Sequence, residues 1–234
     1  MFSRIARRYD LMNTLITAGQ DGRWRRHVAA AALPGSAAPR SGPARPGPRV
    51  LDVGTGTGKL ALALRSRDPR ARVVGLDFAL PMLRRARRQG PVVAADALAL
   101  PFAAAQFEAV TSAFVVRNLA DVRAGLAEQV RVLRPGGYLV VLETTPGPRG
   151  PLRPLARLYF GRVVPLLGRL IAGDAAAYTY LPTSTAAFLE PERLADELRR
   201  AGLVDVSVRR YGWGGVAVSR GRAAGMLPAA GDSA

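Results

Sequence analysis

The chain has 234 residues, of which 49% are hydrophobic, enough for one ordinary domain or one domain with an appendage. It contains no cysteine and one histidine, His27, which excludes disulfides and a cysteine nucleophile and disfavours a histidine-based triad; we expect no metal site. The formal net charge of +17 indicates either an anionic partner, such as nucleic acid or an anionic membrane surface, or basic residues scattered over a solvated surface.

The N-terminal residues 1–33 are predicted to form a helical cap. Apolar residues recur there at spacings of three and four, and the face that they form continues through Trp24 and Val28. Residues 34–48 are rich in proline and glycine and predict a flexible linker. Because the first residues lead into charge and no apolar window is long enough to span a membrane, we expect a cytoplasmic protein without a secretion signal.

From residue 49 onward, predicted strands and helices alternate. Strands are expected at 50–53, 72–76, 92–95, 109–113 and 138–142, and helices at 59–66, 81–88 and 121–133, the last closed by Pro135-Gly136-Gly137. A helix at 191–201 and a hairpin of 204–211 with 215–219 complete a core at 49–220, and 221–234 is expected to be a disordered tail. This order predicts a doubly wound α/β fold with a mostly parallel, seven-stranded sheet and helices on both faces.

Three features are predicted at the carboxyl ends of the strands, where open α/β sheets bind ligands. A glycine turn with Gly54, Gly56 and Gly58 follows the first strand and allows a close approach of backbone to a ligand. Asp77 ends the second strand, where it can bind a ribose diol, and Asp96 ends the third, where it can bind an adenine amino group. Together they predict a nucleoside site; the alternatives are a tight structural turn and two helix N-caps.

The details of the turn disfavour a nicotinamide dehydrogenase. The glycines follow the pattern G-x-G-x-G, which differs from the dinucleotide fingerprint G-x-G-x-x-G. A Tyr-x-x-x-Lys pair is also missing, since the only lysine, Lys59, adjoins the turn. The whole arrangement resembles class I S-adenosylmethionine-dependent methyltransferases, which have a Rossmann-like fold.

Four further segments resemble the ubiquinone/menaquinone biosynthesis C-methyltransferases. They are Tyr9-Asp10-x-Met12-Asn13 with Trp24, Phe114-Val-Val-Arg117-Asn118, Arg131-Val-Leu-Arg134-Pro135-Gly136-Gly137 running to Glu143, and Asp174-x-x-x-Tyr178-x-Tyr180-Leu181. The chain departs from that family at Lys59, usually an acid, at Ala113, often a serine, and at Thr17 and Asp21, which replace a serine and a histidine. Because the Lys59 ammonium would repel a sulfonium, we expect its side chain to point away from the cofactor.

The resemblance implies S-adenosylmethionine as cofactor and assigns its binding residue by residue. Thr57 and the glycines would lie near the methionine part; the alternative for Thr57 is an ordinary turn threonine. Asp77 would hold the ribose, and Asp96 with Ala97 the adenine. The full set of implied cofactor-binding residues is Asp52, Gly54, Gly56, Thr57, Gly58, Asp77, Asp96 and Ala97.

The implied substrate is a prenylated quinol, with demethylmenaquinol converted to menaquinol by C-methylation. We hypothesise that Arg117 and Asn118 orient the quinol oxygens and that Tyr178 or Asp174 assists the departure of a proton. The alternative for Arg117 is a salt bridge to a neighbouring acid. Two other functions stay open: methylation of another small phenolic or quinone-like metabolite, and a non-catalytic basic binding module.

Residues 149–172 combine arginines with a wide apolar face and lie within a predicted substrate lid, 149–181. Such a segment suits an interfacial helix that binds the inner face of the cell membrane peripherally, or a lid helix that buries its apolar face over the active site. No nucleic-acid partner is expected for the reaction, because the chain has no cysteine for attack on cytosine C5 and no D/N-P-P-Y/F tetrad.

Overall fold

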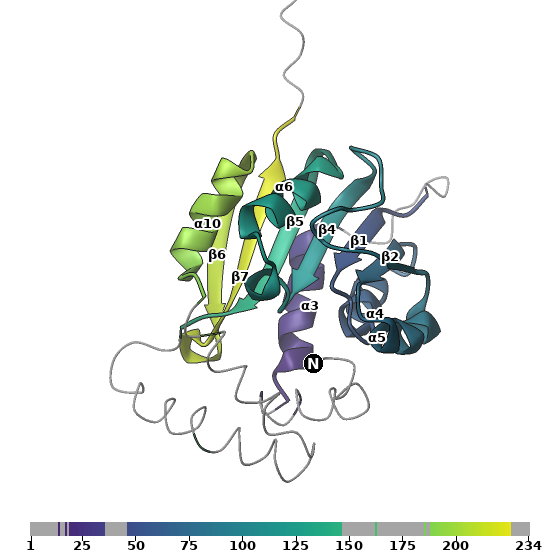
Figure 1. Cartoon of the computed structure of the whole chain (residues 1–234), viewed down its shortest axis with the longest axis horizontal. Coiled ribbons are helices and arrows are strands. Elements are labelled where there is room, and N and C mark those ends of the chain that lie inside the picture. The colour runs from purple at the N-terminus through teal and green to yellow at the C-terminus, as the bar shows by residue number, and fades with distance from the viewer. Residues whose placement is uncertain are drawn as a thin grey trace, which may run out of the picture.

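The computed structural model describes Thr14, Thr17, residues 19–35, residues 46–146, Arg162, Thr185 and residues 188–225. Helices and strands alternate along most of this length, as the sequence predicts (Figure 1). In chain order the elements are α3 (Asp21–Ala32), β1 (Arg49–Val53), α4 (Lys59–Arg67), β2 (Arg72–Asp77), α5 (Leu80–Ala86), η1 (Arg87–Gln89), β3 (Val92–Ala94), β4 (Phe107–Ala113), η2 (Val116–Asn118), α6 (Val122–Arg131), β5 (Leu133–Thr144), α10 (Pro191–Arg200), β6 (Leu203–Tyr211), η5 (Gly212–Gly214) and β7 (Val216–Ala223).

The strands form one seven-stranded sheet in the order β3-β2-β1-β4-β5-β7-β6. The first five strands pair in parallel, while β7 runs antiparallel to both β5 and β6. The predicted doubly wound, mostly parallel sheet with a closing hairpin is therefore confirmed. The chain reverses its direction of winding at β1, whose neighbours are β2 and β4, and this is where such sheets bind ligands.

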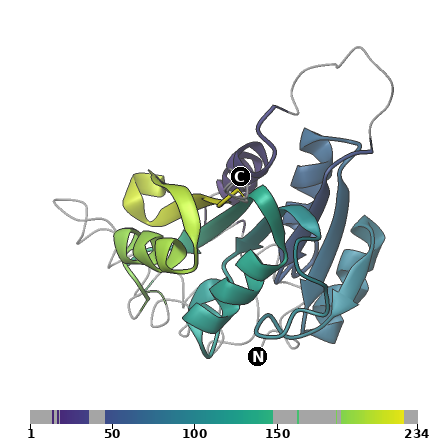
Figure 2. The ribbon, with the colours of Figure 1, turned by 90° about the horizontal axis from the view of Figure 1, so that it is seen from above.

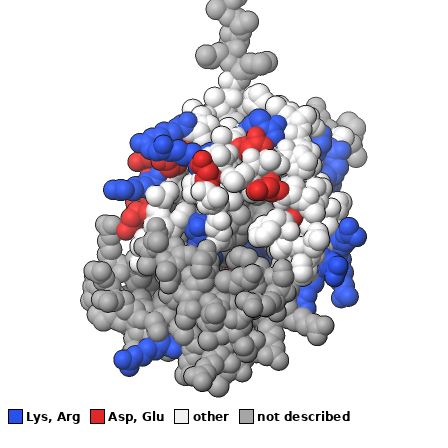
Figure 3. All heavy atoms as spheres, viewed as in Figure 1, with Lys and Arg blue, Asp and Glu red and all other residues white. Residues whose placement is uncertain are grey.

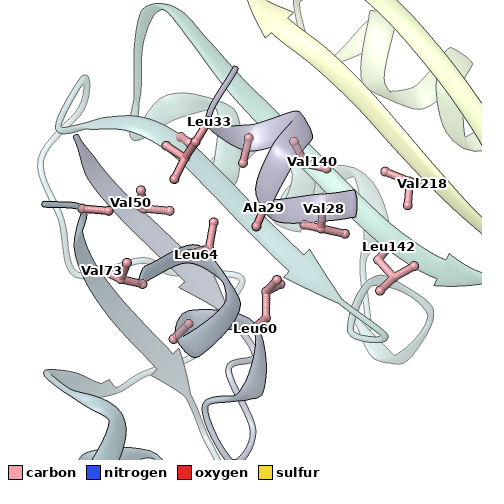
Figure 4. Close-up of a cluster of buried hydrophobic side chains, with 14 of the residues drawn as sticks. Val28, Ala29, Leu33, Val50, Leu60, Leu64, Val73, Val140, Leu142 and Val218 are labelled. Atoms are coloured by element: carbon pink, nitrogen blue, oxygen red, sulfur yellow. The ribbon is translucent and has the colours of Figure 1, made fainter. Parts of the chain in front are cut away.

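Helices cover both faces of the sheet (Figure 2). One apolar cluster joins α3 and α4 to the sheet, and Figure 4 shows Val28, Leu64 and Val140 within it. The other cluster joins α6 and α10 to the opposite face through residues such as Leu126 and Leu198. Because α3 contributes Val28, which is completely buried, this helix packs as part of the core rather than as a separate cap.

Several element boundaries differ from the predicted ones, and two of the differences bear on the outline of the core. Pro135-Gly136-Gly137 does not close a helix: α6 ends at Arg131, and these three residues form an irregularity inside β5. The register jumps from Leu133 opposite Phe107 to Tyr138 opposite Ala109, and Gly136 has a φ of +78° that glycine adopts without steric cost. At the C-terminal end, β7 continues to Ala223, three residues beyond the predicted end of the core.

Some predicted features lie outside the described residues. These are most of the cap before residue 19, most of the linker, the tail beyond residue 225 and the basic segment 149–172 apart from Arg162. Among the helices that are described, none is long and apolar enough to cross a membrane.

Two leucines on α4 provide a matched test of the core. Leu64 is completely buried against the sheet, whereas Leu62 is 49% exposed. Leu64→Ala is expected to lower the free energy of unfolding by about 2–5 kcal/mol, since it leaves a cavity, and Leu62→Ala by less than about 0.5 kcal/mol. Urea titration of both variants measures the difference, and equal losses would contradict the packing described above.

Candidate functional site: a nucleoside cavity at the carboxyl ends of the strands

The glycine turn connects β1 to α4 and has the backbone that its sequence predicts. Gly54, Gly56 and Gly58 all have positive φ angles, of +64°, +58° and +87°. A Cβ atom at Gly54 would lie 2.1 Å from the Val115 side chain, so this position must be glycine for packing as well as for conformation. At Gly56 a Cβ atom would meet no atom within 4 Å, which leaves the backbone open toward a ligand.

A cavity of about 340 Å³ lies beside the turn, a size suited to a small molecule. Six of its lining residues are predicted site residues, drawn from the turn after β1, the end of β2, the segment after β3 and η2. They are Gly54, Gly56, Asp77, Asp96, Ala97 and Asn118. The structure therefore brings together in one cavity the residues predicted to hold ribose and adenine.

Asp77 shapes the cavity as well as lining it. Its Oδ2 atom accepts a hydrogen bond from the Gly56 N–H at 2.9 Å, and its Oδ1 atom accepts one from the Ala79 N–H at 2.9 Å. Each carboxylate oxygen has a further lone pair with which to accept a hydrogen bond from a diol. The acid thus holds the turn against β2 and retains the capacity that ribose binding requires.

Asp96 and Ala97 line the cavity from the segment that follows β3. Asp96 is exposed, and its Oδ1 atom accepts a hydrogen bond from the Leu98 N–H at 2.9 Å, which fixes the bend after β3. Acidic and apolar groups therefore meet around the same space, as a site for a flat base with an amino group would require.

Asp52, Thr57 and Gly58, which the resemblance also assigns to the cofactor, are not among the residues that line the cavity. Asp52 is buried beneath the turn, and its carboxylate accepts hydrogen bonds from the hydroxyls of Thr55 at 2.8 Å and Thr111 at 3.0 Å. Burial raises the pKa of Asp52 to about 6, with a smaller contribution from the negative charge of Asp77 and opposition from the two hydroxyls. The position supports a role in holding the turn from below.

Arg117 and Asn118 belong to the same short helix, η2, but line different cavities. Asn118 lines the cavity described above, and its Nδ2 atom donates to the Phe114 carbonyl at 3.1 Å. Arg117 lines a second cavity of about 440 Å³, between η2, α6 and α10, and forms a buried ion pair with Glu143. The salt bridge that the sequence left as an alternative for Arg117 is therefore present, and Ala120 lines both cavities.

Glu143 holds this arginine from two directions. It accepts hydrogen bonds from the Arg117 guanidinium and, at 3.3 Å, from the Arg117 backbone N–H. The Arg117 Nε atom is buried without a hydrogen-bond partner among the described residues. Since buried donors are rarely left unpaired, this atom is available to a water molecule or a ligand.

Lys59 lies away from the cavity. It is the first residue of α4, and its Nζ atom lies 3.8 Å from an Asp21 carboxylate oxygen at the start of α3. Asp21 is buried and also accepts hydrogen bonds from Arg25 and, at 3.5 Å, from the Thr17 hydroxyl. Lys59 is not among the cavity-lining residues, which agrees with the expectation that its side chain points away from the cofactor.

Sequence reasoning missed the apolar walls of the cavity. They are formed by residues that follow the strand ends, namely Phe78, Met82, Leu98, Phe114, Val115 and Leu119. Phe114 has a φ of +61°, an unfavourable conformation for a bulky residue, at the point where β4 leaves the sheet. The position of Phe78, directly after Asp77, is a sequence signal that could have predicted it as part of the cavity wall. No sequence signal predicts the positive φ angle of Phe114.

The remaining predicted residues, Asp174 and Tyr178, lie outside the described residues. The parallel sheet, the open glycine turn and the two acids around one cavity fit a nucleoside with a polar side arm. The dinucleotide fingerprint is missing, so the fold and the site define a class I S-adenosylmethionine-dependent methyltransferase rather than a dehydrogenase.

Comparison with known proteins gives the family. Residues 1–223 match the model of the ubiE/COQ5 methyltransferase family, and the chain belongs to this family. It is 50% identical over 209 residues to a demethylmenaquinone methyltransferase of Thermus thermophilus, covering 86% of this chain and 90% of that protein. It is 48% identical over 209 residues to a protein of the same name from Deinococcus radiodurans, covering 86% of this chain and 83% of that protein.

Solved structures agree on the fold. A crystal structure of an S-adenosylmethionine-dependent methyltransferase from Thermotoga maritima, named as a possible histamine N-methyltransferase, superposes with a TM-score of 0.67. The two chains are 22% identical, and the match covers 94% of this chain and 97% of that one. At this identity the match shows the fold alone, which is that of a class I methyltransferase.

The raised pKa of Asp52 predicts a specific pH dependence. With a folded pKa of about 6 against an ordinary value of 3.8, the folded state binds more protons than the unfolded state between these values. Stability from this group is therefore complete below about pH 4 and is lost as the pH rises through about 6. Asp52→Asn should remove this loss. The melting temperature of the variant should therefore rise relative to that of the wild type as the pH is raised from 4 to 6. A constant difference across this range would contradict the buried, raised carboxyl.

The contact of Lys59 with Asp21 predicts that the effect of Lys59→Glu on stability changes sign when Asp21 is replaced by a neutral residue. Lys59→Glu places a favourable negative charge at a helix N-terminus, worth about 0.3–1 kcal/mol, but sets it beside a buried carboxylate. We expect the single variant to be less stable by about 1 kcal/mol, since a nearby ion pair is replaced by repulsion. In an Asp21→Asn background the same substitution should stabilise the protein. Chemical denaturation of the four proteins measures both effects, and a stabilising single variant would exclude the contact.

Proposed function

We propose that this enzyme transfers the methyl group of S-adenosylmethionine to a ring carbon of a prenylated quinol, converting demethylmenaquinol to menaquinol. The observation that carries this proposal is the 50% identity to the Thermus thermophilus demethylmenaquinone methyltransferase over 90% of that protein's length. The family match over residues 1–223 supports it, since it spans both the cavity and the segments outside the described residues.

The cavity supports the proposed roles of the cofactor-binding residues. Asp77 binds the ribose diol, Asp96 and Ala97 bind the adenine, and the open backbone at Gly56 faces the methionine part of the cofactor. Asp52 supports the turn from outside the cavity wall through its hydrogen bonds with Thr55 and Thr111. When bound, S-adenosylmethionine supplies an electrophilic methyl group on a sulfonium that leaves as a neutral thioether.

The substrate needs positioning more than covalent help. A quinol that has lost a hydroxyl proton carries electron density onto the ring carbon, which forms the new C–C bond and then releases its own proton. Asn118 lies on the wall of the cofactor cavity, where its amide can orient a quinol oxygen. Tyr178 or Asp174 would assist the departure of the proton, and apolar walls such as Phe114 exclude water from the reacting atoms.

Arg117 acts in this proposal from the second cavity. Its Nε atom, which is buried without a hydrogen-bond partner among the described residues, is the group that would donate to the quinol oxygen and favour the deprotonated form. The ion pair with Glu143 fixes the guanidinium in place for that purpose. A purely structural salt bridge would give the same ion pair without an effect on catalysis, so the two readings differ in kinetics.

Arg117→Ala is expected to lower kcat by about 10²–10³, the cost of removing one group that stabilises developing negative charge. The dissociation constant for S-adenosylmethionine should change by less than about threefold, because Arg117 does not line the cofactor cavity. The single variant also strands the buried Glu143 carboxylate, which costs stability. The double variant Arg117→Ala/Glu143→Gln removes that charge and is the matched control. Loss of cofactor binding by the stable double variant would contradict the assignment.

Turnover tests the proposed substrate directly. The purified enzyme with S-adenosylmethionine should methylate demethylmenaquinol faster than a panel of simple phenols, as measured by mass spectrometry of the products. Cells that lack the protein should accumulate demethylated menaquinone. Cofactor binding with turnover on unrelated phenols alone would indicate another substrate, and the absence of cofactor binding in calorimetry would indicate a non-catalytic module.

A further inference from the structure

The outer face of α5 and η1 is basic and apolar at the same time. Its members recur at spacings of four and three, which places them on one side of the helix. They are Leu80, Arg84, Arg87 and Arg88, and we call them the α5 face. Leu80 is 56% exposed and the three arginines are exposed, while Met82, Leu83 and Ala86 are buried on the inner side.

No carboxylate of the described residues neutralises the charge of the α5 face. Residues 78–95 contain no aspartate or glutamate, and no carboxylate of the described residues forms an ion pair with Arg84, Arg87 or Arg88. Arginines of α10 behave differently, since Arg199 and Arg200 pair with acids on their own helix. In Figure 3 blue side chains gather along the right-hand edge, where Figure 1 places α4 and α5, without red side chains between them.

The face adjoins the entrance of the cofactor cavity. Met82 belongs to the same helix and lines the cavity from inside. Phe78, two residues before the helix, also lines the cavity, and it is 73% exposed, the highest value among the exposed large hydrophobic residues. A surface that bound here would therefore lie beside the reaction site.

We propose that the α5 face docks on an anionic lipid bilayer. Arginines beside an exposed leucine and phenylalanine match the two layers of such a surface, because guanidinium groups bind the headgroup phosphates and apolar side chains enter the acyl boundary. The inference rests on the proposed function, since a prenylated quinol resides in the membrane and has to reach the cavity from it. A nucleic acid would use the arginines but would leave Leu80 without a partner.

Vesicle binding by the full chain tests the face. The variant Arg84→Gln/Arg87→Gln/Arg88→Gln removes three charges, and its partitioning onto vesicles of phosphatidylglycerol and phosphatidylcholine should fall by about 100-fold, as expected from the contribution of each basic residue near an anionic surface. The matched control, Arg199→Gln/Arg200→Gln/Arg209→Gln, removes three exposed charges from the far end of the sheet and should change partitioning by less than about threefold. Leu80→Ser should weaken the binding that remains at high salt, where charges are screened.

Two assays separate this proposal from the proposed function. With a short-chain, water-soluble quinol both triple variants should keep wild-type turnover, and with a long-chain quinol in anionic vesicles the α5 variant alone should lose it. If the wild type fails on both substrates, the proposed function is wrong, whatever its vesicle binding. Equal vesicle binding by the two triple variants would contradict the proposed membrane-binding role of the α5 face. So would an α5 variant that lost affinity for duplex DNA or RNA but kept its vesicle binding.

Discussion

The hydrogen bond from the Gly56 N–H to the Asp77 carboxylate is the interaction on which the site depends. It ties the turn after β1 to the end of β2, and the Thr55 N–H bonds to the Leu76 carbonyl beside it at 2.9 Å. Gly75 makes room for this contact, since a Cβ atom there would lie 2.8 Å from the Thr55 side chain. Loss of the acid would therefore release the turn as well as remove the proposed ribose ligand.

A short helix, η2, separates the chemistry into two spaces. Asn118 faces the cofactor cavity and Arg117 the second one, while Ala120 lines both. Glu143, at the end of β5, anchors the arginine from the sheet. A displacement of η2 as a whole, unlike the loss of one side chain, would therefore affect both cavities, because its two neighbouring residues line different ones.

The fold and the convergence of predicted site residues on one cavity were predictable because they depend on local patterns. Alternating apolar runs identified the strands, and acids at strand ends, such as Asp77 and Asp96, converge whatever the side-chain details. The pairing of Arg117 with Glu143 was open, since these residues lie 26 positions apart and only the register of the sheet brings them together. Pro135-Gly136-Gly137 was misread because a helix stop and a strand irregularity use the same residues.

The solitary lysine has a practical consequence. Because 33 of the 34 basic side chains are arginines, Lys59 carries the only side-chain amine in the protein, next to the last glycine of the turn. Reagents that acylate primary amines would thus modify one side chain, 34% exposed, within one residue of the cofactor site. Its reaction rate reports on the state of the glycine turn, so the composition of this chain supplies a local probe that needs no engineered residue.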